Sequence, residues 1–168
     1  MIKKLFSAIS LASILFLFSS CEKEGNYYDI EDVSKLKMLS FEYWELYEYT
    51  VAPDVDAEEL EPESIFTSLP SCELDNIYEF TLDGEMITHE GYTKCAVNDP
   101  DSFITYFTLS EKESKIVMWA DPENPEGTHL FSGNINYPSV DEFYWVFRKY
   151  NELTEKTEEH SYYFKQKD

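Results

Sequence analysis

Apolar and polar residues alternate with a period of two from Phe41 onward, in about eight short runs. Successive side chains of a strand point to opposite faces of a sheet, so each run predicts a strand with one face toward a core. The pattern therefore predicts an all-β fold. The predicted strands cover residues 44–51, 77–81, 86–92, 102–109, 115–120, 128–137, 141–149 and 159–166.

Short turns join these predicted strands in sequence. Asp83-Gly84 is a strong hairpin signal, and Gly133 predicts a bulge or bend within its strand. Ser64 to Leu69 predicts a short helix. Because no long helical segment intervenes, we expect a lipocalin-like up-and-down antiparallel β-barrel of about eight strands over residues 41–168, since closure removes sheet edges. A β-sandwich is the alternative architecture, and no second domain is apparent.

The first 20 residues predict a secretory signal peptide. Two lysines precede an apolar run from Leu5 to Phe18, and two small serines follow that run. The run is too short for a comfortable membrane-spanning helix. The segment ending at Cys21 resembles a bacterial lipobox, which implies cleavage before Cys21 and lipidation of its thiol. An ordinary secretory signal with an incidental cysteine is the alternative.

Residues 21–40 are expected to form the lipidated cysteine and a tether. Two or more acyl chains attach a protein stably to a bilayer, whereas one chain holds it only marginally. Glu22-Lys23-Glu24 looks like the Lys-plus-acid export signals of some Gram-negative lipoproteins. We therefore expect an outer-membrane lipid anchor, at the cell surface or on the periplasmic face. The spacing of Asp32, Val33, Leu36 and Leu39 allows one or two helical turns in the tether.

The mature chain is strongly acidic. The full chain holds 13 Lys and Arg and 34 Asp and Glu, and two of the lysines lie in the signal, so 11 basic and 34 acidic residues remain, a formal charge of −23. Such a surface repels nucleic acid and anionic lipid, so neither is an expected partner. Aromatic residues make up 17% of the chain. This share argues against disorder and favours packed β-structure, an aromatic binding surface, or both.

Two cysteines remain once Cys21 carries lipid, namely Cys72 and Cys95. The oxidising environment outside the cytoplasm favours a disulfide between them. A zinc site needs more ligands than two cysteines provide. We therefore expect a Cys72–Cys95 disulfide.

The same two cysteines flank a patterned hairpin. It runs from Cys72-Glu73-Leu74-Asp75 through the aromatic strand Ile77-Tyr78-Glu79-Phe80 and the Asp83-Gly84 turn to Gly91-Tyr92-Thr93-Lys94-Cys95. This arrangement resembles the bacterial lipocalin-like lipoproteins, as do Trp44 on the first strand and the closing Tyr162-Tyr163-Phe164-Lys165. The resemblance covers roughly residues 40–166. It implies a small barrel on a membrane anchor without implying one ligand.

The chain departs from the lipocalin pattern at the first strand. The Gly-x-Trp of lipocalins is here Glu42-Tyr43-Trp44, so the glycine is missing. In lipocalins a basic residue packs over the tryptophan. Lys165 and Arg148 are both candidates for that residue.

Motifs for catalysis are absent from the sequence. It holds no Gly-rich phosphate loop, nucleophile elbow or His-Glu-x-x-His motif, and His89, His129 and His160 lie on different predicted elements. We expect these histidines to be solvated, and we expect no enzyme activity and no cofactor. Asp54-Val55-Asp56-Ala57-Glu58-Glu59 groups oxygen ligands of the kind calcium prefers, but it lacks the central glycine of an EF-hand loop. It is expected to be a solvated acidic loop, and no metal site is predicted.

The aromatic residues remain as candidates for function. On residues 141–149 both faces of the predicted strand carry apolar groups, and most aromatic residues are expected in the core. A small eight-stranded barrel is either filled by its own side chains or holds one small ligand. We expect a small apolar or amphipathic ligand. The residues expected to line its cavity are Trp44, Phe80, Phe107, Trp119 and Trp145.

The alternative is a surface interaction or structural protein. Its acidic and aromatic outer face would then contact another protein or a glycan. A contiguous exposed aromatic patch outside the barrel would favour this alternative. An enzyme would instead need a cleft where a histidine and a carboxylate converge.

Overall fold

The computed structural model describes residues 34–53, 55 and 61–167. The predicted signal peptide, Cys21 and the tether up to residue 33 lie outside the described residues. So do Asp54 and residues 56–60, which make up most of the predicted acidic loop. Among the described residues, no helix has the length and apolar character needed to cross a bilayer.

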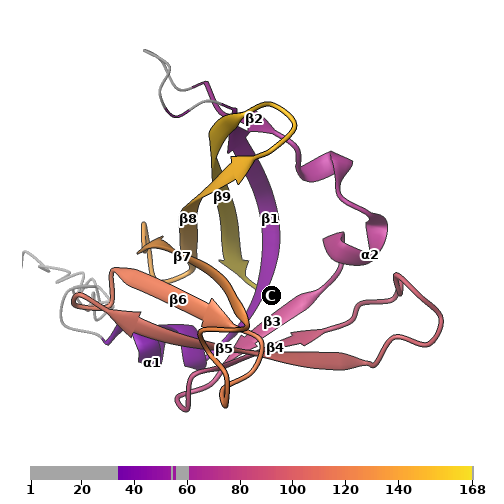
Figure 1. Cartoon of the computed structure of the whole chain (residues 1–168). Coiled ribbons are helices and arrows are strands. Elements are labelled where there is room, and N and C mark those ends of the chain that lie inside the picture. The colour runs from indigo at the N-terminus through magenta and orange to yellow at the C-terminus, as the bar shows by residue number, and fades with distance from the viewer. Residues whose placement is uncertain (1–33, 54, 56–60, 168) are drawn as a thin grey trace, which may run out of the picture.

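The described chain is almost entirely β-structure (Figure 1). The helices are short: α1 covers Lys35–Ser40, the 3₁₀ helix η2 covers Phe66–Ser68 and α2 covers Ser71–Leu74. The strands are β1 (Tyr43–Ala52), β2 (Glu63–Ser64), β3 (Ile77–Phe80), β4 (Glu85–His89), β5 (Ser102–Ser110), β6 (Lys115–Trp119), β7 (His129–Asn136), β8 (Glu142–Asn151) and β9 (Lys156–Gln166).

Eight of these strands close into an antiparallel up-and-down barrel, which confirms the predicted architecture over the sandwich. β1 and β3 to β9 pair in sequence order, and β9 pairs back with β1. The closing ladder runs from Trp44 opposite Gln166 to Ala52 opposite Glu159. A β-bulge lies in it between Leu46 and Glu48. β2 adds a short ladder beside the far end of β1.

The strands differ from the predicted ones mainly at their ends. β9 begins at Lys156, and its ladder with β8 continues to Asn151. The polar residues there have no apolar face, so the alternation does not reveal them as strand. The segment predicted as a helix over Ser64 to Leu69 forms the end of β2 and then η2.

The helix α1 closes one end of the barrel. Leu39 is fully buried, and the Trp44 indole N–H donates a hydrogen bond to the Leu39 carbonyl over 2.9 Å. The Ser34 hydroxyl and the Lys35 backbone N–H both donate to the Glu113 carboxylate in the turn between β5 and β6. Residues 34–40, the end of the predicted tether, therefore pack against the barrel as part of the folded domain.

The core fills the barrel beside α1. Phe143 lies at its centre, with its ring centroid 4.8 Å from Trp44 in an edge-to-face contact and 4.7 Å from Phe164 in a stacked one. The cluster consists of Leu39, Trp44, Leu46, Phe80, Met86, Phe107, Ile116, Met118, Ile135, Phe143, Trp145 and Phe164. These side chains come from β1, β3 to β9 and α1, so a single core joins all the strands of the barrel.

Gly133 was predicted to be a bulge or a bend, and the structure shows no bulge there. It pairs regularly with Ile116 on β6 and Phe147 on β8. A Cβ atom on Gly133 would lie 2.2 Å from the Val146 carbonyl oxygen, so glycine lets the two backbones approach. The irregularity between β6 and β7 lies instead between Met118 and Trp119.

Candidate functional site

An aromatic-lined cavity of about 430 Å³ lies at the end of the barrel opposite α1. Seven aromatic residues line it: Tyr78, Phe103, Phe131, Trp145, Phe147, Tyr162 and Phe164. Its other lining residues are Glu73, Asn76, Met86, Thr88, Glu90 and Cys95. Residues two apart on β8 and on β9 both contribute, because alternate side chains of a strand face the barrel interior.

The rings lie against one another along the wall of this cavity. Phe147 stacks on Phe131 with ring centroids 4.7 Å apart, and on Tyr162 with centroids 5.9 Å apart. Trp145 and Phe164 lie at the border between cavity and core, since they belong to both.

Three residues of this cavity hold a buried polar atom without a hydrogen-bond partner in the described chain. These atoms are the Thr88 hydroxyl oxygen, Glu90 Oε2 and the Trp145 indole nitrogen. Buried polar atoms in proteins are usually paired, because leaving one unpaired costs about 1–3 kcal/mol. The wall of the cavity therefore retains a hydroxyl, an acceptor and a donor that a bound molecule can satisfy.

A chain of polar side chains lies beside the cavity. The Tyr162 hydroxyl donates to Tyr49, and the Tyr49 hydroxyl lies 2.6 Å from His160 Nδ1. His160 Nε2 then lies 3.4 Å from Glu158 Oε2, near enough to attract it but without hydrogen-bond alignment. Burial lowers the pKa of His160 below its ordinary value of 6.5, although Glu158 opposes this. At neutral pH His160 is therefore uncharged, and its Nδ1 accepts a hydrogen bond from the Tyr49 hydroxyl.

The histidines were expected to be solvated, and this prediction is wrong for His160, which is buried. His160 is only 8% exposed, between the Tyr49 and Phe147 rings. His89 is partly exposed and lies 2.9 Å from Glu79, and His129 lies on the surface. The alternation of β9 places His160 and Tyr162 on one face, but their partners on β1 and β8 follow only from the register of the closed barrel.

A disulfide and two hydrogen bonds join the α2 region to the β4–β5 loop at the rim of the cavity. Cys72 of α2 and Cys95 of the loop between β4 and β5 form the predicted disulfide, with Cα atoms 5.1 Å apart. Asn76 accepts a hydrogen bond from the Gly91 N–H over 3.2 Å. Asp75 accepts one from the Thr93 N–H over 3.0 Å. The cysteine-flanked motif thus joins α2 to the β4–β5 loop at the cavity.

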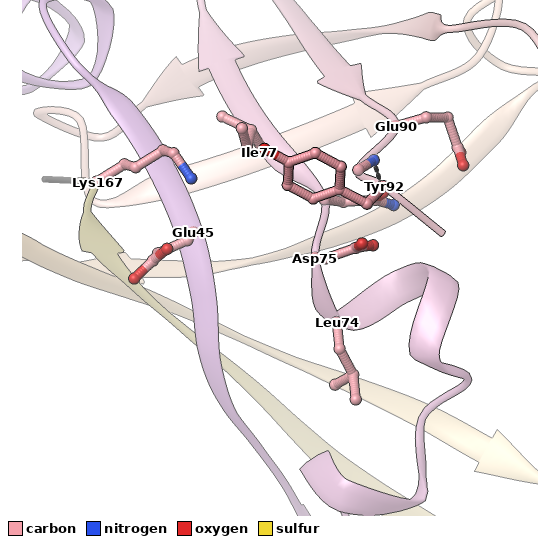
Figure 2. A pocket seen from close by; sticks show the side chains of 9 residues that line it. Glu45, Leu74, Asp75, Ile77, Glu90, Tyr92 and Lys167 are labelled. Carbon is pink, nitrogen blue, oxygen red and sulfur yellow. Dashed lines mark hydrogen bonds between the residues drawn. The ribbon is translucent and has the colours of Figure 1, made fainter. Parts of the chain in front are cut away.

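A second hollow, of about 510 Å³, lies outside the barrel wall next to these two hydrogen bonds. Figure 2 shows Glu45 and Lys167 on one side of it and Asp75, Glu90 and Tyr92 on the other. The Tyr92 side chain is fully exposed. Although this hollow is larger, four of its nine lining residues are charged and only one of the nine is aromatic. The aromatic cavity is therefore the stronger candidate for an apolar ligand.

The five predicted lining residues lie in different places. Trp145 lines the cavity. Trp44, Phe80 and Phe107 are at most 4% exposed and belong to the core near α1. Trp119 lies at the end of β6, outside both the core cluster and the cavity lining.

The residues that sequence reasoning missed lie two positions nearer the open end. Tyr78 precedes Phe80, Phe147 follows Trp145 and Tyr162 precedes Phe164. The period-two pattern gives the face of each residue but not its depth in the barrel. The direction of each predicted strand could have shown this depth, because it indicates which residues of a strand lie near which end of the barrel.

Polar clusters elsewhere in the described residues include a histidine near a carboxylate but no arrangement that could hold a metal ion. Among the described residues, no group of three or more His, Cys, Asp or Glu is arranged to hold a metal ion. A further hollow, of about 340 Å³, is lined by Lys149, Glu158 and His160 among others, so a histidine and a carboxylate do converge there. The expected lack of enzyme activity stays a prediction.

The comparisons with known proteins add no family. No protein-family model matches this chain, and no curated protein matches it with significance. The resemblance to lipocalin-like lipoproteins stays a prediction. It rests on the cysteine-flanked hairpin and Trp44, beside a barrel whose closure the structure establishes.

Proposed function

We propose that this protein is a lipid-anchored carrier or receptor that holds a small apolar or amphipathic molecule in the open end of its barrel. The observation that supports this proposal is the aromatic-lined cavity of about 430 Å³. Ligand sites are typically concave and mostly apolar, with a few polar groups that orient the ligand. The unpaired Thr88, Glu90 and Trp145 atoms supply such groups.

Native mass spectrometry of the full-length protein, extracted in a mild detergent, tests the ligand. We expect a non-covalent adduct in the wild type and its loss in Thr88→Phe, because the added ring occupies the cavity. Ile87→Phe is the matched control, since Ile87 neighbours Thr88 on β4 but is not among the lining residues. An adduct retained by Thr88→Phe and lost from Ile87→Phe would contradict the site.

The anchor has its own test. Labelling of growing cells with a radioactive fatty acid should mark the wild-type protein and not Cys21→Ala. An ordinary secretory signal predicts instead that neither protein is labelled. This result would remove the anchor from the proposal and leave the cavity untouched.

A run of tyrosines on the outer face favours a second candidate, contact with a glycan. Tyr163 of β9 lies between Tyr47 and Tyr144, with ring centroids 6.3 Å and 5.1 Å away. Exposed aromatic rings offer flat apolar faces against which sugar rings can pack. Glycan-array binding that is lost in Tyr144→Ala/Tyr163→Ala, and kept in Tyr150→Ala, would support this second function. Tyr150 is exposed on β8 away from these three rings.

A further inference from the structure

The charged residues that line the aromatic cavity are all acidic. Glu73 of α2 and Glu90, directly after β4, both line it. None of the described residues that line it is a lysine or an arginine. Histidine is absent from its lining as well, and the nearby His160 is kept uncharged by burial.

The two carboxylates act on the interior wall. Burial is the main cause that raises the pKa of Tyr78 to about 12, and Glu73 and Glu90 raise it further because they repel the phenolate. Glu73 also raises the pKa of Tyr49 and of Tyr162, again after burial. A negative potential therefore reaches the tyrosines of β9, β1 and β3, three neighbouring strands that form one continuous part of the barrel wall.

The uncharged part of the wall also favours positive charge. The faces of aromatic rings attract cations, with Trp the strongest, and this attraction increases when water is excluded. Trp145 lines the cavity with such a ring, whereas Phe147 and Tyr162 also line it but stack on neighbouring rings. Glu90 Oε2 is buried and receives no hydrogen bond within the described chain. An ammonium group is a donor that would satisfy this oxygen and neutralise its charge.

We propose that the cavity selects amphipathic cations, namely apolar ring systems or chains that carry an ammonium group, and excludes the corresponding carboxylic acids. The ammonium lies between Glu73 and Glu90, and the apolar part lies among Trp145, Phe147 and Tyr162. The unpaired Trp145 N–H can donate to an oxygen or ring nitrogen of the same ligand. This inference rests on the proposed ligand-binding role of the barrel and names its ligand class.

Equilibrium dialysis with three probes of one shape tests the selection. The probes are 1-naphthylmethylamine, 1-naphthylmethanol and 1-naphthoic acid, which share a ring system and carry a positive, a neutral and a negative group at pH 7. We expect the amine to bind at least tenfold more tightly than the alcohol, and the acid more weakly than the alcohol. In Glu73→Gln/Glu90→Gln the amine should lose at least tenfold in affinity while the alcohol is unchanged.

Non-specific attraction to an acidic surface requires a matched control. Glu42→Gln/Asp83→Asn removes the same charge from exposed positions at the α1 end of the barrel. It should leave binding of the amine unchanged. An equal loss of amine binding in both double variants would overturn the inference, because general attraction would then explain the preference.

The remaining outcomes separate this inference from the proposed function. If all three probes bind with similar affinity and Thr88→Phe abolishes binding, the cavity binds ligands without selecting cations, and the inference fails alone. If no probe binds and no adduct is found in the native protein, the proposed function fails with it. The three probes on the wild type decide the selection even if the Glu73 and Glu90 variant does not fold.

Discussion

The Tyr49 hydroxyl and His160 Nδ1 lie 2.6 Å apart, on the first and last strands of the barrel. The backbones of β1 and β9 already pair through this region, with Tyr49 opposite Tyr162 and Val51 opposite His160. The closing seam therefore holds a buried side-chain hydrogen bond in addition to its ladder. This bond exists only when the barrel is closed.

Replacing Tyr49 by Phe should lower the free energy of unfolding by about 1–2 kcal/mol, because His160 then lacks a donor at Nδ1. Chemical denaturation followed by tryptophan fluorescence measures this loss. Tyr47→Phe is the control, since the Tyr47 ring lies on the outer face beside Tyr163. Equal losses in the two variants would contradict a specific role of the buried bond.

The burial of His160 predicts a pH dependence. Its pKa in the folded protein is below 6.5, so between 6.5 and that lower value the unfolded chain binds a proton that the folded chain does not. The contribution of His160 to stability is therefore complete above pH 6.5 and declines as the pH falls below it. Unfolding of the wild type and His160→Gln at pH 7.5 and 5.5 measures this contribution as a difference. A difference that grows on acidification would refute the assignment.

Trp44 should be the most sensitive single position tested in the core. It is fully buried, packs edge-to-face on Phe143 and donates to the Leu39 carbonyl. Trp44→Ala should destabilise the fold by about 3–5 kcal/mol. Trp44→Phe should cost about 2 kcal/mol, since it also removes the bond that holds α1. Trp119→Phe removes an indole nitrogen without a hydrogen-bond partner, so a loss as large as that of Trp44→Phe would contradict this account.

The disulfide should stabilise the fold because the loop that it closes restricts the conformations of the unfolded chain. Cys72 and Cys95 are 23 residues apart, which corresponds to about 3 kcal/mol in the chain-entropy treatment. Cys72→Ser/Cys95→Ser should lose this amount in denaturant unfolding. A reducing agent should lower the stability of the wild type similarly and leave the variant unchanged. If the reducing agent destabilised both proteins equally, its effect would not come from the disulfide, and the prediction would be wrong.

Gly133 should not accept a side chain. The Val146 carbonyl oxygen lies 2.2 Å from the place of its Cβ atom, and backbone cannot move aside as a flexible side chain can. Gly133→Ala should therefore cost about 2 kcal/mol, within the usual range for overpacking. Thermal unfolding monitored by circular dichroism measures the effect. Ser132→Ala on the neighbouring position should be nearly neutral, and the reverse order would refute the close approach.

Much of the barrel could be predicted from the sequence, because period two is a local property. The alternation around Phe143, Trp145 and Phe147 indicates that these side chains share one face of the strand, and Asp83-Gly84 indicates a hairpin. The closing pair of β1 and β9 follows less directly, from the number of strands and the need to remove edges. The register of that pair, with its bulge after Leu46, depends on contacts between distant residues.

The candidate site was less predictable because depth is a property of the whole barrel. Trp44 and Phe80 face inward as expected, yet α1 covers that end and the rings pack solidly there. The spacing of Leu36 and Leu39 predicts a helical turn. It does not predict that this turn packs against one end of the barrel and closes it. Thr88 and Glu90 carry no distinguishing pattern in so acidic a chain.

The closing pair of β1 and β9 has a consequence for biogenesis. A nascent chain that emerges N-terminus first releases β1 early, while the residues 156–166 that cover one of its edges follow more than a hundred positions later. Until then that edge is free to join strands of neighbouring molecules, a common origin of aggregation. Correct folding thus requires that the N-terminal strands of different nascent chains stay apart until β9 has been synthesised.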